Sequence, residues 1–325
     1  MTAPRQADAL QQFRRLHQDG ILLLADAWDA GSARLIESLG AKAIATTSAG
    51  LAWAHGYPDG DVLPFDLLVA TTAGIARIVK VPLTVDSEGG YSDDPAAVGE
   101  SIGRLIGAGA AGINLEDGVG SPDLLCAKIE AIKRAAARSG QDVFINARTD
   151  VYLRGLAPEG GRVAEVLARA GRYRDAGADG IFVPGATKPD EIKAIAAAAP
   201  LPLNVMSRPG LPGAAELAAL GVRRLSAGSG ISQSVYARTA ELARSFLQDG
   251  VSDPLVSGAM PYPEINALGA GAQPPALPPS RAARLSRLGS NQISRPRLAS
   301  RTQSRRALLA ARCCEISPIT ASFSR

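Results

Sequence analysis

The stretch VPLTVDSEGGYSDDP, residues 81–95, decides the fold. A short β-rich run ends at Asp86, and a polar segment with two consecutive glycines follows, which is typical of a buried strand that runs into a loop. Similar runs recur along the chain and alternate with longer Ala-rich segments of helical period. The eight predicted strands cover residues 21–26, 42–47, 81–86, 111–116, 142–148, 179–184, 202–206 and 222–228.

This alternation predicts an α/β protein, and eight strand–helix units within residues 1–250 are typical of a TIM (β/α)8 barrel. A doubly wound open sheet is the alternative, but no GxGxxG pattern follows the first strand. We expect the barrel over 1–250, a helical segment over 251–273 and a disordered Arg-, Pro- and Ser-rich tail over 274–325. The predicted helices include residues 32–39, 96–106, 123–137, 161–174, 189–197 and 214–220.

The positive charge of the chain lies in this predicted tail. The net charge is +4 overall, whereas the tail from Pro274 carries ten arginines against the single acid Glu315. Residues 1–273 are therefore mildly acidic, with a net charge of −5. An arginine-rich tail can bind RNA or anionic surfaces. Because aromatic residues are not interleaved with these arginines, we do not expect a nucleic-acid partner.

Composition also bears on the compartment. No apolar run reaches the roughly 18 residues of a membrane-spanning helix, and the N-terminal stretch MTAPRQADALQQFRRLHQDG has no apolar signal-peptide core. The three cysteines, Cys126, Cys313 and Cys314, offer neither a disulfide framework nor the spacing of a zinc site. We therefore expect a cytoplasmic protein without a membrane partner.

Polar residues gather at three successive predicted strand ends. In a TIM barrel the carboxyl ends of the strands carry the chemistry, and side chains alternate between the two faces of each strand. The residues predicted to share the inner face are Thr84, Asp86 and Glu88, then Asn114 and Glu116, then Asn146 and Arg148. The apolar residues between them are expected to face the helices.

Asp86, Glu88 and Glu116 predict a divalent metal site. Three carboxylates in a dry cavity repel one another unless a cation lies among them. Oxygen ligands alone favour Mg²⁺ or Mn²⁺ over zinc. Arg148, one strand further on, can bind a substrate carboxylate bidentately. The alternative role for Arg148 is a structural ion pair that neutralises Glu116.

Five motifs resemble the isocitrate lyase/phosphoenolpyruvate mutase superfamily over roughly residues 10–250. They are TTSAGLAWAHGYPDGD (46–61), VDSEGGYSDDP (85–95), GINLEDG (112–118), FINARTDVYL (144–153) and LNVM (203–206). The resemblance implies a Mg²⁺-dependent TIM barrel acting on a small 2-oxo or 2-hydroxy carboxylate. It also implies a homo-oligomer, a dimer or tetramer, that packs through the C-terminal segment DPLVSGAMPYPEINALG (253–269).

The resemblance also implies roles for individual residues. Backbone N–H groups of Ser48, Ala49 and Gly50 would hold the substrate carboxylate or enolate. Asp59 would reach the metal through water. The remaining implied residues are the metal ligands Asp86, Glu88 and Glu116, the carboxylate clamp Arg148 and the substrate-binding Asn204, with Arg148, Glu116 and Asp59 forming the catalytic set.

The chain departs from the superfamily pattern in two places. Glu88 replaces an aspartate and is one methylene longer, so it can bind through water or shift the ion. The Lys-Lys-Cys-Gly-His loop of the lyases is absent, and residues 116–132, EDGVGSPDLLCAKIEAI, take its place with Cys126 in a predicted helix. The expected reaction is cleavage of a C–C bond through an enolate. P–C bond or phosphoenolpyruvate/phosphonopyruvate chemistry and a non-catalytic oxo-acid-binding barrel are the alternatives.

Several further residues keep two interpretations. His55 is either a proton carrier or an exposed loop residue, and Tyr91 either faces a ligand or packs. Trp28 and Asp29 either shape the pocket wall or serve as a packed indole and a helix cap. The glycine-containing loops SRPGLPG (207–213) and SAGSG (226–230) also admit a phosphorylated ligand or a flavin, since loops after strands seven and eight bind phosphate in many TIM barrels.

Overall fold

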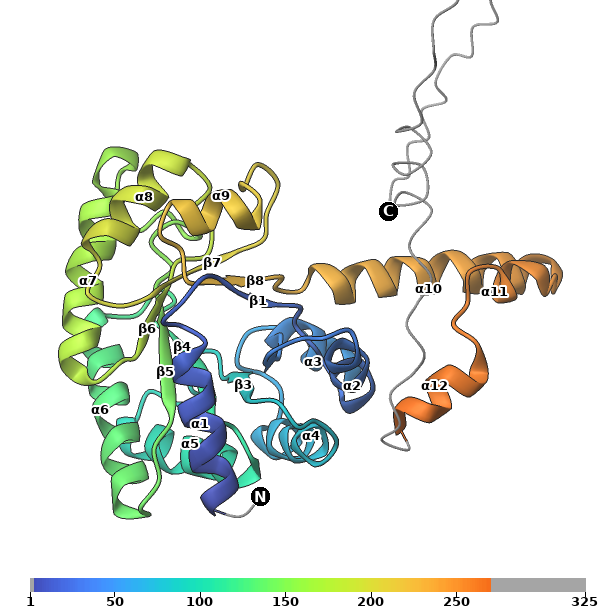
Figure 1. Cartoon of the computed structure of the whole chain (residues 1–325), viewed down its shortest axis with the longest axis horizontal. Helices are drawn as coiled ribbons and strands as arrows, with labels where there is room; N and C mark the ends of the chain where they lie inside the picture. Colours follow the sequence, from blue (N-terminus) through green and yellow to red (C-terminus); the bar gives the residue numbers. More distant parts are fainter. Residues whose placement is uncertain (1–2, 270–325) are drawn as a thin grey trace, which may run out of the picture. The chain divides into compact units, whose positions relative to one another are not determined.

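The computed structural model describes residues 3–269 of the chain. Eight parallel strands form one sheet in the order β1-β8-β7-β6-β5-β4-β3-β2, with helices around it (Figure 1). The strands are β1 (Leu22–Leu24), β2 (Ile44–Ala45), β3 (Leu83–Asp86), β4 (Gly112–Glu116), β5 (Phe144–Arg148), β6 (Gly180–Phe182), β7 (Leu203–Met206) and β8 (Arg224–Ser226). Each lies within a predicted run, so the TIM-barrel prediction is confirmed.

The sheet closes between its first and second strands. Ala27 and Thr46 form a parallel bridge, where the Ala27 N–H donates to the Ala45 carbonyl (2.8 Å) and the Thr47 N–H donates to the Ala27 carbonyl (3.0 Å). Closure brings the carboxyl ends of all the strands to one rim, the end of the barrel that carries the chemistry in enzymes of this fold.

The helices begin and end at residues whose chemistry favours those positions. Before the fifth helix the Asp94 side chain accepts the Ala96 N–H, and Gly109 ends that helix in the left-handed region. The helices are α1 (Ala3–Arg15), α2 (Ala30–Ser38), α3 (Ser48–Ala54), α4 (Phe65–Ile78), α5 (Pro95–Ala108), α6 (Pro122–Arg138), α7 (Arg162–Ala176), α8 (Pro189–Ala198), α9 (Ala214–Ala219), α10 (Gly230–Asp249), α11 (Asp253–Val256) and α12 (Tyr262–Gly269), with a 3-10 turn at Glu159–Gly161.

The main hydrophobic core lies between the strands and the surrounding helices. Its strand side is formed by outward-facing residues that are fully buried: Val85, Ile113, Leu115, Ile145, Ile181 and Val205. This is the alternation predicted from the sequence, since the intervening polar residues of β3, β4 and β5 face the barrel interior. The polar strand-end residues are thereby directed inward by the packing of their apolar neighbours.

The barrel interior is polar around its middle and apolar at its base. The Asn146 side chain donates to the amide oxygens of Asn114 and Asn204, both at 2.9 Å. Below this layer, Phe13 of α1 packs with a small apolar cluster from the strand starts. A Cβ on Gly112 would lie 2.8 Å from the Phe13 ring, so a glycine is required where α1 approaches the barrel.

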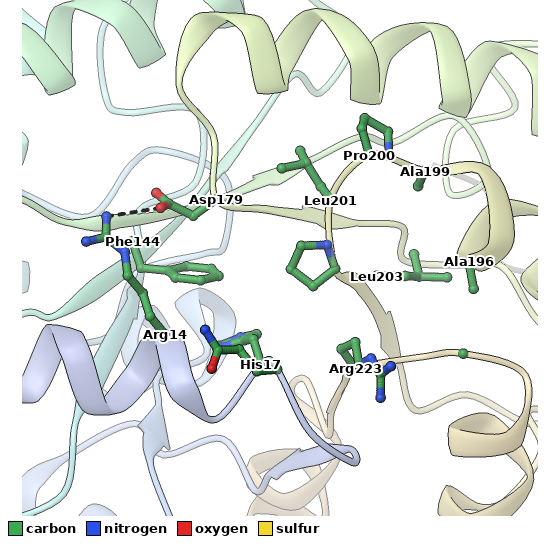
Figure 2. A pocket seen from close by; sticks show the side chains of 13 residues that line it. Arg14, His17, Phe144, Asp179, Ala196, Ala199, Pro200, Leu201, Leu203 and Arg223 are labelled. Atoms are coloured by element: carbon green, nitrogen blue, oxygen red, sulfur yellow. Dashed lines mark hydrogen bonds and ion pairs between the residues drawn. The ribbon is translucent and has the colours of Figure 1, made fainter.

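A cavity of about 570 Å³ lies beside the amino ends of β5, β6, β7 and β8. Figure 2 shows Arg14 of α1, and His17 in the turn that follows α1, on one side of it, facing Leu201 and Leu203. The carboxylate in its wall, Asp179, accepts hydrogen bonds from Arg14 (3.1 Å) and from the Lys133 ammonium group (2.8 Å). The acid in this cavity is thus paired with cations.

The segment after β8 is helical but packs little against the barrel. Ser232 is the only buried residue of α10, whereas α12 lies against α2 and buries Leu268. Helices α11 and α12 fall in the predicted segment 251–273. The tail predicted over 274–325 lies outside the described residues. Within residues 3–269 no helix is long and apolar enough to cross a membrane.

Candidate active site

A small cavity of about 160 Å³ lies at the carboxyl ends of the strands. Its volume corresponds to about five water molecules. The lining residues are Asp26, Thr47, Ser48, Ala49, Asp59, Asp86, Asn114, Arg148, Leu153, Phe182, Met206, Ser226, Gly228 and Ser229. A ligand of a few heavy atoms fits this space, and the wall offers both carboxylates and a guanidinium group.

Asp86 is held at the end of β3 by the neighbouring strand. Its N–H donates to the Thr46 hydroxyl (2.9 Å), and its Oδ2 accepts the Ser48 N–H (3.3 Å). The other carboxylate oxygen, Oδ1, is buried and has no hydrogen-bond partner among the described residues. A carboxylate oxygen with no donor is available to a cation.

Ser48, Ala49 and Gly50 form the first turn of α3, a helix that was not among those predicted from the sequence. The N–H groups of a first turn have no intrahelical acceptor; here the Thr47 side chain accepts the Gly50 N–H and Asp86 accepts the Ser48 N–H. Ser48 and Ala49 line the cavity. Gly50 lies behind them, where an added Cβ would approach the Ser232 hydroxyl to 2.9 Å, and is not among the lining residues.

Asp59 lines the same cavity from the loop between α3 and α4. Partial burial raises the pKa of its carboxyl group, and the nearby Asp86 carboxylate adds to this, while a Ser48 hydrogen bond and the Arg148 charge oppose it. Asp59 and Asp86 are therefore two acids in one small space, and the predicted water-mediated contact of Asp59 with a metal stays a prediction. Their mutual repulsion favours a cation between them.

Arg148 and Glu116 occupy paired positions on β5 and β4. Arg148 Nη1 lies 2.5 Å from Glu116 Oε2, and Arg148 Nε and Nη2 donate to the two Asp150 oxygens at 2.7 and 3.1 Å. Burial raises the pKa of Glu116 to about 8, although Arg148 acts in the opposite direction. The structural ion pair weighed as an alternative thus exists, and Arg148 also lines the cavity.

A second layer of buried charge fixes the Arg148 fork. Asp150 is fully buried and its N–H donates to Asp117 Oδ1 at 2.9 Å. Asp117 Oδ2 in turn accepts hydrogen bonds from Arg169 Nη1 (2.8 Å) and the Tyr173 hydroxyl (2.6 Å). Satisfied networks of this kind hold a functional side chain in one rotamer.

Glu88 does not share the inner face with Asp86, because β3 ends at Asp86 and Glu88 adopts a left-handed φ of 49°. Its carboxylate accepts hydrogen bonds from the Gly60 N–H (2.9 Å), the Asp61 N–H and the Tyr91 hydroxyl (2.7 Å). Asp61 reciprocates by accepting the N–H groups of Gly89 (3.3 Å) and Tyr91 (3.2 Å). Glu88 thus links the loop at residues 60–61 to the loop at residues 88–91 through hydrogen bonds.

The three predicted metal ligands are not gathered around one point. No group of three or more His, Cys, Asp or Glu side chains among residues 3–269 is placed to hold a metal ion. The unpartnered Asp86 Oδ1 nevertheless fits Mg²⁺, which usually takes only one or two carboxylates and keeps several waters. Metal binding at this rim stays a prediction, with Asp86 as the direct ligand that the geometry favours.

Asn204 lies one layer below the cavity. Its amide group donates to the Arg224 carbonyl (3.1 Å) and accepts from Asn146, so it is used inside the barrel. Conversely, sequence reasoning missed Asp26, which lines the cavity at the end of the first strand run. The rule that pointed to Asp86 and Glu116, a carboxylate where a strand ends, applies equally to Asp26.

The residues with two interpretations are also placed. Asp29 caps α2 by accepting the Ser32 N–H, and Tyr91 bonds Glu88 through its hydroxyl. His55 is exposed and its Nε2 lies 3.0 Å from the Thr71 hydroxyl. Cys126 is half-buried on α6. None of these four lines the 160 Å³ cavity.

Fold and cavity together define a TIM barrel with a small site, lined by carboxylates and one arginine, at its carboxyl rim. The chain belongs to the phosphoenolpyruvate phosphomutase family, whose family model matches residues 13–247. It is thereby a member of the isocitrate lyase/phosphoenolpyruvate mutase superfamily, which confirms the resemblance seen in the motifs.

Individual relatives agree with this membership. The chain is 39% identical over 262 residues to an uncharacterised Mycobacterium tuberculosis protein, covering 78% of this chain and 95% of that one. It is 32% identical to oxaloacetate decarboxylase of Paraburkholderia xenovorans, covering 67% and 76%. The crystal structure of a protein described as a candidate phosphonomutase, from Burkholderia cenocepacia, matches with 43% sequence identity and a TM-score of 0.69. The match covers 73% of this chain and 99% of that one.

Proposed function

We propose that the chain is a Mg²⁺- or Mn²⁺-dependent enzyme that cleaves a C–C bond of a small 2-oxo or 2-hydroxy dicarboxylate through an enolate. The observation that carries this proposal is the pairing, in one cavity of about 160 Å³, of a carboxylate with a free oxygen and a fixed guanidinium group. Such a reaction requires a cation, which the carboxylate would bind, and an anionic substrate, which the guanidinium group would bind.

The chain's own groups would divide the work as follows. Asp86 would bind the cation directly, with Asp59 acting through water. When bound, Mg²⁺ supplies Lewis-acid stabilisation of the negative oxygen of an enolate. Arg148 would bind the substrate carboxylate, since Asp150 holds its guanidinium in place. The Ala49 N–H in the first turn of α3 would donate to a substrate oxygen.

Oxaloacetate is the first substrate to test. The named relative with 32% identity is an oxaloacetate decarboxylase, and the cavity volume suits a four-carbon acid. It is smaller than the roughly 300–1,000 Å³ of sites that take drug-sized ligands. A flavin is therefore too large for this cavity. Gly228 and Ser229, from the loop considered as a phosphate-binding loop, line the same cavity.

Phosphorus–carbon chemistry is the second candidate. It is favoured by the 43% identity to the candidate phosphonomutase. The two chemistries differ in the leaving group but use the same enolate, so one cavity can serve either. A non-catalytic oxo-acid-binding barrel is the third candidate, and it would bind the same ligands without turnover.

A substrate panel separates these candidates. The wild-type chain is incubated with oxaloacetate, alkylmalates, methylisocitrate and phosphonopyruvate, with Mg²⁺ or with EDTA, and the formation of pyruvate, phosphate or phosphoenolpyruvate is followed. We expect release from a dicarboxylate only with Mg²⁺, and loss of that release in Glu116→Gln. Phosphate release from phosphonopyruvate alone would favour the second candidate. A Mg²⁺-dependent thermal shift by oxalate without turnover would favour the third.

We further propose that the chain is a homo-oligomer that uses α10. This helix exposes Val235, Tyr236, Phe246 and Leu247, while an apolar cavity of about 590 Å³ beside β1 and α2 includes the exposed Leu23. Exposed large apolar side chains of this kind favour a protein partner. Light scattering after size exclusion should give a dimer or larger, and Phe246→Glu with Leu247→Glu should shift the mass toward a monomer. A monomeric wild type would contradict the proposal.

A further inference from the structure

Asp26 is a buried acid in the catalytic cavity with no role in the reaction described so far. It follows β1, is 4% exposed and lines the 160 Å³ cavity together with Asp86 and Arg148. Its Oδ2 accepts the Gly228 N–H at 2.6 Å. Its Oδ1 is buried and has no hydrogen-bond partner among the described residues, so this oxygen is free to carry a proton.

Asp26 does not form an ion pair with any described cationic side chain. Arg224 of β8 is buried in the barrel interior, yet among the described residues no cation lies within 4.0 Å of the Asp26 carboxylate. Asp86 of β3 is the nearby acid. Burial raises the pKa of Asp26 to about 8 and Asp86 adds to this, whereas Arg224 and the Gly228 N–H oppose it.

Several other candidates for proton transfer lie outside the cavity or are held by a partner, and Asp59, which does line it, is assigned to the cation. Cys126 and His55 do not line the cavity, and His55 lies against Thr71. Glu116 is held by Arg148, and Tyr91 donates its hydroxyl proton to Glu88. Because the lyase cysteine loop is also absent from the chain, the enolate needs a proton donor from another part of the rim.

We propose that Asp26 is the catalytic acid–base that protonates and deprotonates the enolate carbon, a role that rests on the proposed enolate chemistry. With oxaloacetate, the C3–C4 bond breaks, CO₂ leaves and its bonding electron pair moves into the pyruvate enolate. The Asp26 carboxyl group then gives its proton to C3, which yields pyruvate, and the resulting carboxylate regains a proton from water. In the reverse sense the carboxylate removes a C3 proton from pyruvate.

The reverse step gives a test that needs no bond cleavage. Exchange of the pyruvate methyl protons with D₂O is followed by NMR in the presence of Mg²⁺, against a blank without protein. Asp26→Asn should lower this exchange, and any oxaloacetate cleavage, by at least about 100-fold, the lower range for general acid–base catalysis. Asp26→Asn should keep the Mg²⁺-dependent thermal shift by oxalate, because the amide oxygen can still accept the Gly228 N–H. Asp26→Glu should restore part of the exchange.

Asp19→Asn is the matched control, since Asp19 is an exposed acid that precedes β1 and does not line the cavity. It should exchange pyruvate protons at the wild-type rate. Exchange in Asp26→Asn within threefold of wild type would overturn the proposal, as would a wild type that cleaves oxaloacetate without exchanging pyruvate protons. Loss of the oxalate shift in both Asp26 variants would show that Asp26 holds cation or ligand instead. Exchange without cleavage of any dicarboxylate would sink the proposed function alone.

Discussion

The two ends of the barrel differ in whether their buried or partly buried carboxylates have partners. At the amino end, Asp179 and Asp142 both contact Arg14 and Lys133, so each carboxylate has cationic partners. At the carboxyl rim, Asp26 and Asp86 each keep a buried oxygen that has no hydrogen-bond partner within residues 3–269. Paired acids add to stability, whereas unpaired buried acids are unfavourable until a ligand arrives. The difference favours the 160 Å³ cavity, and not the one at the amino end, as the candidate functional site.

The sharpest test of this contrast is Asp86→Asn. We expect kcat/KM to fall by at least about 100-fold, because the substitution removes the charge that would hold the cation. Stability should change by less than about 1 kcal/mol, since Asp86 Oδ1 has no donor to lose. Kinetics with the best substrate of the panel and urea unfolding measure the two quantities. A large loss of stability with activity retained would reverse the assignment of this end.

The opposite result is expected at the amino end, for Asp179→Asn. Asp179 Oδ2 accepts hydrogen bonds from Lys133 (2.8 Å) and the Ile145 N–H (3.0 Å), and its side chain is largely buried. Removing its charge should lower the free energy of unfolding by about 2 kcal/mol. kcat/KM should stay within threefold of wild type. Equal losses in both quantities would mean that the two ends are coupled.

The ends should also differ in the pH dependence of stability. The pKa of Asp26 is raised from 3.8 to about 8, so the stability linked to its proton is lost as pH rises toward 8. His17, whose pKa burial lowers to about 3, opposes this below pH 6.5, because its contribution is lost as pH falls. Between pH 6.5 and 8 the metal-free protein should therefore become less stable.

Urea unfolding of the EDTA-treated protein at pH 6.5 and 8 measures this slope. Glu116, with a pKa also raised to about 8 by burial, adds a slope of the same sign. Asp26→Asn should therefore reduce the slope without abolishing it. The same slope in wild type and Asp26→Asn would show that Asp26 is ionised across this range.

The sequence predicted the barrel because eight runs of apolar residues recur at regular spacing, and it predicted Asp86 and Arg148 because period two holds within β3 and β5. It could not predict Glu88, since alternation stops where the strand ends and the left-handed φ depends on hydrogen bonds from a distant loop. The helix at Ser48 was missed because its small residues carry no amphipathic pattern. Tertiary contacts therefore decide the position of Glu88, which the local sequence pattern does not indicate.

The smallest expected effect is that of Asp142→Asn at the amino end. Asp142 contacts Arg14 at 2.6 Å, but its side chain is 42% exposed. Its partial burial acts to raise its pKa, yet Arg14 and Lys133 outweigh this and lower it. The linked stability is thus present above about pH 4 and lost below it, opposite in sign to Asp26. Solvent screens such a pair, so we expect a loss of about 0.5 kcal/mol at pH 7.

Salt distinguishes this exposed pair from the buried Asp179 pair. At 1 M NaCl the Debye length falls to about 3 Å, so the difference between wild type and Asp142→Asn should become too small to measure, while the Asp179→Asn difference should persist. Urea unfolding at low and high salt provides the comparison. The loss of unfolding free energy in Asp142→Asn could instead equal that in Asp179→Asn and persist at 1 M NaCl. The two amino-end acids would then form one buried network with Arg14 and Lys133. In that case both acids at the amino end would stabilise the fold, in contrast to the unpaired acids of the carboxyl rim.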